Sequence, residues 1–337
     1  MQNLIIFTSK DRDTLLKLRK GESKFGEHVQ LISKLTNIYD DINNLDVDYV
    51  IFGISEDIGV YANHGNTGAY KAWQTVIKVL LNIQSNGFTK AKRVLILGHL
   101  DYSQERDIVT QTPTKKSILK ARQLVELIDK DVTYLISSIV KAGKIPIVIG
   151  GGHNNAYGNI KGLALAKNDK VNVVNLDAHT DFRPEEGRHS GNGFSYAYAE
   201  GFLKNYFIFG LHENYTSDKL FKTLKKLKPI KYNTYEAIDI RGELDFTSEL
   251  ERASHHISGK HFGVEVDCDA IENIPSSAET PSGFSAKRAR QFVHYFGQHH
   301  KASYLHICEA SPRKKSAHKV AKLISYLITD FIRAHTN

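Results

Sequence analysis

The sequence predicts an α/β protein with a mostly parallel sheet and helices on both faces of that sheet. Short apolar runs rich in β-branched residues recur along the 337 residues, and most are continuous rather than alternating. Continuous apolar runs are typical of strands buried on both faces of a parallel sheet. Amphipathic helical patterns lie between the runs, and this alternation favours one α/β domain.

The predicted strands are seven apolar runs, and the opening NLIIFTS is a candidate for another. The seven runs cover residues 48–54, 93–101, 144–153, 170–179, 205–213, 261–269 and 303–312.

Two long helical patterns have apolar residues at spacings of three and four. The first covers 121–143 and ends at Gly143, a residue suited to the left-handed C-cap of a helix. The second covers 317–335 and closes the chain. Since no repeat, low-complexity segment or Pro/Gly-rich linker divides the sequence, we predict a single domain over 1–337, with 1–45 as its N-terminal part.

The composition indicates a soluble globular protein, with 41% apolar and 24% charged residues. The net charge of +8 comes from scattered Lys and Arg rather than a nucleic-acid motif. The opening apolar run is too short for a secretory signal, and no stretch could span a bilayer. Cys268 and Cys308 are the only cysteines, which favours reduced thiols in the cytoplasm. We therefore expect neither a nucleic-acid partner nor a membrane partner.

Polar residues gather at the carboxyl ends of four predicted strands, where ligands bind in open α/β sheets. The candidates are His153, Asp177, His179, Asp181, Asp267, Asp269 and Glu309. Asp267 and Asp269 are two positions apart, so a strand directs both carboxylates to one side. Each motif alone could be a turn or a helix cap, but together they predict a metal site.

The number of ligands indicates two metal ions rather than one. Four carboxylates held close together repel one another unless cations lie between them. The oxygen-rich set suits Mn²⁺ better than zinc, with Mg²⁺ and Fe²⁺ as alternatives. Two such ions lower the pKa of a bridging water and so hold hydroxide ready for attack at neutral pH.

The motifs GGGH, DAHTD, DCD and ICEASP, in this order, resemble those of the ureohydrolases: arginases, agmatinases and formimidoylglutamases. The segment GVYANHGNTGA (59–69) resembles the glycine-rich N-terminal segment of that family. The resemblance implies a three-layer α/β sandwich around a mostly parallel sheet of eight strands. It also implies two Mn²⁺ per chain and a homo-oligomer.

The resemblance further implies which residues hold each ion. The first set is His153, Asp177, Asp181 and Asp267. The second set is Asp177, His179, Asp267 and Asp269, so that Asp177 and Asp267 bridge the two ions. Glu309 matches the carboxylate that receives the cationic amidine or guanidine of the substrate. We assign Asp181 as the proton shuttle to the leaving amine.

Three features favour a formimidoylglutamase within this family. Gly152 stands where arginases and agmatinases usually have Asp, and Phe194 stands where arginases have a proton-shuttling histidine. Arg183 is a candidate reader of a substrate carboxylate, aided by Ser190 and Asn192. The predicted reaction converts N-formimino-L-glutamate and water to L-glutamate and formamide. We interpret the neighbouring His189 as a surface or loop residue.

The alternatives are hydrolysis of another amidino or guanidino acid, with release of urea, and a catalytically silent relative that uses the fold for binding. Some positions depart from the family pattern: Glu265 replaces the usual serine before the DCD motif, and Asn154 follows GGGH. These departures bear on the choice of substrate but remove no predicted metal ligand.

Overall fold

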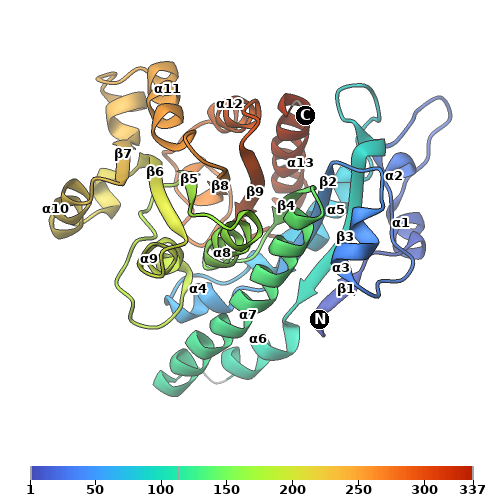
Figure 1. Ribbon diagram of the computed structural model, residues 1–337, viewed down its shortest axis with the longest axis horizontal. Coiled ribbons are helices and arrows are strands. Elements are labelled where there is room, and N and C mark those ends of the chain that lie inside the picture. The colour runs from blue at the N-terminus through green and yellow to red at the C-terminus, as the bar shows by residue number, and fades with distance from the viewer. Residues whose placement is uncertain (1, 112–113, 336–337) are drawn as a thin grey trace.

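A computed structural model of the chain describes residues 2–111 and 114–335. In that part of the chain, nine strands form one sheet in the order β1-β3-β2-β4-β9-β8-β5-β6-β7 (Figure 1). The strands are β1 (Leu4–Ile6), β2 (Tyr49–Ser55), β3 (Val94–Asp101), β4 (Ile145–Ile149), β5 (Val171–Leu176), β6 (Leu203–Leu211), β7 (Ile230–Thr234), β8 (Phe262–Asp267) and β9 (Ala302–Cys308).

The seven predicted runs correspond to β2–β6, β8 and β9, and the sheet has nine strands where the resemblance implies eight. All pairings among β2–β9 are parallel. A ninth strand, β1, pairs antiparallel with β3 at one edge and comes from the opening apolar run. The apolar pattern missed β7 at the other edge. Only Ile230 and Asn233 of β7 are buried, so this strand has no continuous apolar run.

Helices cover both faces of the sheet and make the predicted three layers. The helices are α1 (Ser9–Leu15), α2 (Phe25–His28), α3 (Ile38–Asn43), α4 (Ile58–Ala62), α5 (Ala72–Leu80), α6 (Ser103–Thr110), α7 (Lys115–Lys141), α8 (Asn155–Lys167), α9 (Gly193–Ala199), α10 (Asp218–Lys226), α11 (Phe246–Ile257), α12 (Ala286–Gly297) and α13 (Ala317–Ala334). One hydrophobic core lies under α5, α11, α12 and α13, and the other under α4, α7, α8 and α9 (Figure 1).

The two long helices form close to where the sequence predicts them. The first, α7, begins earlier than expected because the Thr114 side chain accepts a hydrogen bond from the Ser117 backbone N–H and caps it. Gly143 follows its end with a left-handed φ of 73°. Within the described residues, every helix is too short or too polar to cross a membrane.

Candidate metal centre

The predicted ligands meet at the carboxyl ends of four neighbouring strands, β4, β9, β8 and β5. Parallel register places them side by side: Leu176 pairs with Val266, so Asp177 lies next to Asp267. Asp267 in turn pairs with Cys308 on β9. Side chains of paired residues on neighbouring strands point to the same face of a sheet, so Asp177, Asp267 and Cys308 form one row on one face.

His153 reaches this row from the glycine turn after β4. Gly150 and Gly151 adopt φ of 86° and 74°, which a residue with a side chain rarely adopts. A Cβ on Gly151 would lie 2.4 Å from Asn155 Nδ2. The turn brings the fully buried His153 ring over the strand ends.

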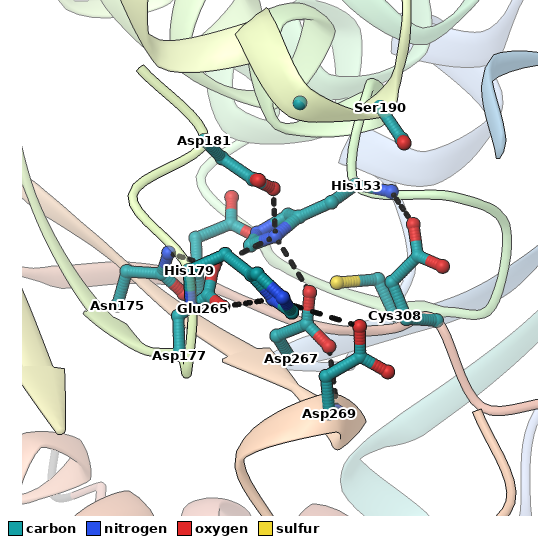
Figure 2. Close-up of polar contacts among 12 residues, drawn as sticks. His153, Asn175, Asp177, His179, Asp181, Ser190, Glu265, Asp267, Asp269 and Cys308 are labelled. Carbon is teal, nitrogen blue, oxygen red and sulfur yellow. Dashed lines mark hydrogen bonds and ion pairs between the residues drawn. The ribbon is translucent and has the colours of Figure 1, made fainter. Parts of the chain in front are cut away.

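The first set of ligands is compact (Figure 2). The Nδ1 atom of His153 lies 2.8 Å from Asp181 Oδ2, 3.0 Å from Asp267 Oδ2 and 3.2 Å from Asp177 Oδ2. All four ligand atoms lie within 4.8 Å of one another. An octahedral divalent ion with bonds of about 2.1 Å keeps adjacent ligand atoms about 3 Å apart. The spacing therefore fits a divalent ion of this size.

The second set lies beside the first and is more open. His179 Nδ1 lies 3.6 Å from Asp177 Oδ1 and 3.8 Å from Asp269 Oδ2. The Asp269 backbone N–H donates to Asp267 Oδ1 over 2.7 Å, which ties the two carboxylates of the DCD motif together. The His179 ring stacks on Tyr215, with ring centroids 5.3 Å apart.

The four carboxylates of the two sets repel one another unless protons or cations neutralise them. Burial, together with Asp269 and Asp177, raises the pKa of Asp267 well above its usual range. Burial alone would lower the pKa of His179, but hydrogen bonding to Asp177 and the charges of Asp177, Asp269 and Asp181 raise it to about 10. Without cations, protons neutralise this cluster; divalent metals would replace them.

Glu309 lies beside the cluster in a strained backbone conformation. Its φ is 60°, a left-handed value uncommon for a residue other than glycine. Its Oε1 accepts a hydrogen bond from the His153 backbone N–H over 2.7 Å. Its buried Oε2 has no hydrogen-bond partner among the described residues. Burial and the nearby Asp269 raise the pKa of Glu309 to about 8.

A single cavity of about 710 Å³ joins the cluster to solvent. Its lining includes His179, Asp181, Arg183, Ser190, Lys219, Asp267, Asp269 and Glu309. Glu309 is 2% exposed, whereas the Arg183 side chain is 51% exposed, so the carboxylate lies deep and the guanidinium lies near the opening. The Arg183 guanidinium donates to Asn63 Oδ1 over 2.7 Å and to Glu186 Oε1 over 3.2 Å.

Asn192 does not line the cavity, in contrast to the predicted substrate contact. Its side-chain oxygen accepts from Arg188 Nη1 over 2.6 Å and from the His189 backbone N–H over 3.0 Å. Its side-chain nitrogen donates to the Gly187 carbonyl oxygen over 2.9 Å. These bonds use the buried amide to hold the 181–192 loop, so Asn192 has no group left for a substrate.

His189 is fully buried, so its interpretation as a surface residue is wrong, although it does lie in a loop. Its Nδ1 accepts from the Gly191 backbone N–H over 3.1 Å. Burial and the nearby Arg183 and Arg122 lower the pKa of His189 to about 4. A neutral histidine therefore supports the loop from within.

Phe194, at the position of the arginase histidine, is also fully buried. Its ring stacks on Tyr206 with centroids 4.4 Å apart and meets the His153 ring edge-on at 5.1 Å. The side chain therefore packs against a predicted ligand and carries no proton.

The sequence motifs missed three buried residues that support the site. Glu56, just after β2, accepts from the Gly152 backbone N–H over 3.0 Å and so holds the glycine turn. Asn175 donates to Asp177 Oδ2 over 2.8 Å. Arg188 forms an ion pair with Asp129 of α7, 2.8 Å between Nε and Oδ2. Two of the three could have been found from the sequence. Glu56 directly follows a predicted strand, and Asn175 lies two residues before Asp177 on another.

Comparison with known proteins gives a consistent family and fold. The sequence model of the arginase family matches residues 47–333. A formimidoylglutamase of Streptococcus gordonii is 26% identical over 302 residues, which cover 86% of each chain. The crystal structure of Trypanosoma cruzi formiminoglutamase with Mn²⁺ has a TM-score of 0.72 at 19% identity, covering 94% of this chain and 100% of that one. Proclavaminate amidino hydrolase from Streptomyces clavuligerus has a TM-score of 0.67 at 19% identity, covering 88% and 95%.

Proposed function

The chain belongs to the arginase family, and we propose that it hydrolyses N-formimino-L-glutamate to L-glutamate and formamide with two bound divalent metal ions. The formimidoylglutamase of S. gordonii and the Mn²⁺-containing formiminoglutamase of T. cruzi support both the reaction and the choice of Mn²⁺. The chemistry of the substrate can be matched to the cavity residue by residue.

The two ligand sets are the proposed metal sites. His153, Asp177, Asp181 and Asp267 hold one ion, and Asp177, His179, Asp267 and Asp269 hold the other. The spacing of about 3 Å around His153 Nδ1 supports the first assignment. The approach of His179 to Asp177 and Asp269 supports the second.

The observation that carries the choice of substrate is the polarity of the cavity. Its deep end holds the Glu309 carboxylate beside the predicted metal ligands. Two exposed cationic side chains, Arg183 and Lys219, line its outer part together with one carboxylate, Glu185. Formiminoglutamate has a cationic formimino group at one end and two carboxylates at the other. A ligand of this polarity fits the cavity in one direction, with the formimino group innermost.

The hydrolysis adds water to the formimino carbon and breaks the bond from that carbon to the glutamate nitrogen. Bound divalent ions supply an activated water at neutral pH and stabilise developing negative charge. Glu309 orients the formimino group by pairing its free carboxylate oxygen with the cationic nitrogen. Asp181 lines the cavity and passes the proton from water to the departing glutamate nitrogen. Arg183 holds a substrate carboxylate, and Ser190 adds a hydrogen bond.

A substrate panel on the Mn²⁺-loaded protein tests this proposal. The panel comprises formiminoglutamate, arginine, agmatine, guanidinobutyrate and guanidinopropionate, with formamide and urea measured separately. We expect formamide and glutamate from the first compound. Release of urea from a guanidino compound in preference would assign a different substrate. Two bound metals with no turnover of any compound would indicate a silent relative.

We also infer that residues 1–337 act as one domain in the cytoplasm. The continuous sheet from β1 to β9 supports one domain. The buried free thiols of Cys268 and Cys308 support a reducing compartment. The resemblance also predicts a homo-oligomer and a place for the reaction in histidine breakdown.

A further inference from the structure

Glu265 is a fully buried carboxylate that the proposed reaction does not use. It lies on β8 two residues before Asp267, so both side chains are on the same face of the sheet. Its Oε1 accepts from the Tyr304 hydroxyl over 2.7 Å. Its Oε2 lies 2.5 Å from His306 Nδ1 and 3.6 Å from His153 Nε2. A buried charge with this many partners requires an explanation.

The register between β8 and β9 places these residues next to one another. Glu265 pairs with His306 across β8 and β9, and Gly263 pairs with Tyr304. A Cβ on Gly263 would lie 2.0 Å from Tyr304 Cζ, so only glycine allows the Tyr304 ring to lie across β8 and reach Glu265. These residues occupy the rows directly below the row of Asp177, Asp267 and Cys308.

The cluster also connects to the glycine turn that carries His153. His306 Nε2 lies 3.3 Å from the Gly150 carbonyl oxygen, while its Nδ1 faces Glu265. His306 therefore lies between the carboxylate and the start of the turn. Tyr304 and His306 together hold Glu265 at a fixed position under the His153 ring.

The two nitrogens of His153 face different partners. Nδ1 faces the three carboxylates of the first set, and Nε2 faces Glu265. Glu265 is the carboxylate whose closest approach to the His153 ring is to Nε2, whereas Asp177, Asp181 and Asp267 each approach closest to Nδ1. The Cys308 thiol also lies within 4.8 Å of a ring nitrogen of His153, but a thiol is neutral and a weak hydrogen-bond acceptor. At 3.6 Å the approach to Glu265 is longer than a hydrogen bond, and the buried Nε2 has no hydrogen-bond partner among the described residues.

We propose that Glu265 is a positioning residue that accepts the Nε2–H of His153 and thereby presents Nδ1 to the metal of the first set. A histidine ligand typically donates its other ring N–H to a carboxylate, a carbonyl or water, which fixes the tautomer and raises the basicity of the ligand. Glu265 supplies an anionic partner from the sheet, where a serine could offer only a shorter, neutral one. The inference rests on the proposed metal site and adds a residue that controls one of its two ions.

The test is metal binding by Glu265→Gln, which keeps the shape of the side chain and removes its charge. Equilibrium dialysis against graded Mn²⁺, with metal content measured by mass spectrometry, gives two dissociation constants. We expect the constant of the first set to rise about 10- to 100-fold, the usual effect of losing such a partner. The constant of the second set, which does not contain His153, should change less than threefold.

Electron paramagnetic resonance adds a readout that a general loss of stability would not produce. At a Mn²⁺ concentration that fills both wild-type sites, the variant should lose the signal of the coupled pair and keep that of an isolated ion. Tyr304→Phe is the matched control, because it removes one hydrogen bond from Glu265 and leaves the carboxylate in place. It should bind both ions with dissociation constants within threefold of wild type.

The outcomes separate this inference from the proposed function. A wild-type protein that binds no divalent metal would refute the metal site itself. Two ions bound as tightly by Glu265→Gln as by wild type would refute the role of Glu265 alone, as would equal weakening of both ions. If Glu265→Gln does not fold, Glu265→Asp decides, since it keeps the charge but draws it away from His153. Unchanged affinity of the first set in that variant would also overturn the inference.

Discussion

Glu309→Gln is the sharpest test of how the cavity receives a cationic substrate. Glu309 is 2% exposed, and its two oxygens have different surroundings: Oε1 accepts from the His153 backbone N–H, whereas Oε2 has no hydrogen-bond partner among the described residues. Glutamine has the same shape, and its amide oxygen can keep the bond to His153. The substitution therefore removes mainly the charge that would face the formimino group.

The magnitude follows from the burial of this group. An enclosed, charge-assisted contact is worth about 2–4 kcal/mol, or roughly 30- to 1000-fold in kcat/KM. Solvent does not screen a group this buried, so no discount for exposure applies. Burial and Asp269 raise the pKa of Glu309 to about 8 in the metal-free protein, so assays at pH 8.5 keep most of the wild-type carboxylate ionised, and bound cations favour the ionised form further.

The assay combines turnover of formiminoglutamate with metal content. We expect Glu309→Gln to retain two metals and to lose kcat/KM within the stated range. Glu309→Ala is the comparison, because it also leaves the His153 N–H without its acceptor and should weaken metal binding. Glu309→Gln with kcat/KM within threefold of wild type would refute the pairing, and loss of metal from this variant would make Glu309 a ligand.

Three further predictions concern the ligands, the opening of the cavity and pH. Asp267→Ala should lower the occupancy of both metals, measured by mass spectrometry, and abolish turnover; two metals with near-normal activity would contradict the bridging role. Arg183→Ala should raise KM for formiminoglutamate with metals retained, by only about tenfold, since this half-exposed guanidinium is partly screened by water. Arg183→Lys should recover part of the loss because it keeps the charge without the fork; unchanged kinetics in Arg183→Ala would remove the residue from the site. The pKa of His179 is about 10 in the folded protein against 6.5 ordinarily, so its contribution to stability is full below pH 6.5 and is lost as pH rises towards 10. The melting temperature of metal-free protein should therefore fall from pH 7 to pH 10, and Mn²⁺ should reduce that fall; a flat profile would contradict the assigned contacts.

The central part of the fold could be predicted because its strands are buried on both faces. The runs that became β2, β4, β5, β8 and β9 are mostly apolar and buried along almost their whole length, and burial on both faces favours such a pattern. The edge strand β7 escaped prediction for the same physical reason: one side of an edge strand faces water, so polar residues interrupt the run. An apolar pattern therefore indicates that a segment is buried, and it indicates a strand only where that strand is buried.

The predicted ligands could be found because they follow strand ends: four of them lie within two residues of a strand end or a glycine turn, and His179 and Asp181 follow β5 by three and five residues. Parallel strands bring such ends to one edge of the sheet without further information. The 181–192 loop was harder, because the contacts of its side chains depend on partners far away in the chain. Arg188 bonds Asp129 of α7, 59 positions earlier, and that bond helps to bury His189 and Asn192. When residues of a distant helix hold a loop in place, the sequence of the loop alone does not predict where its side chains point.

Glu265 shows that the neighbours of a strand residue across the sheet follow from strand register and not from sequence spacing. Spacing of two places Glu265 and Asp267 on one face of β8, but it does not say which residue lies beside either of them. Register with β9 sets Glu265 beside His306 and Asp267 beside Cys308. Register with β5 sets Asn175, which bonds Asp177, beside Glu265. The row that contains Glu265 is therefore as ordered as the row of predicted ligands. If Glu265 has the proposed role, this departure from the family pattern alters metal binding without changing any predicted ligand.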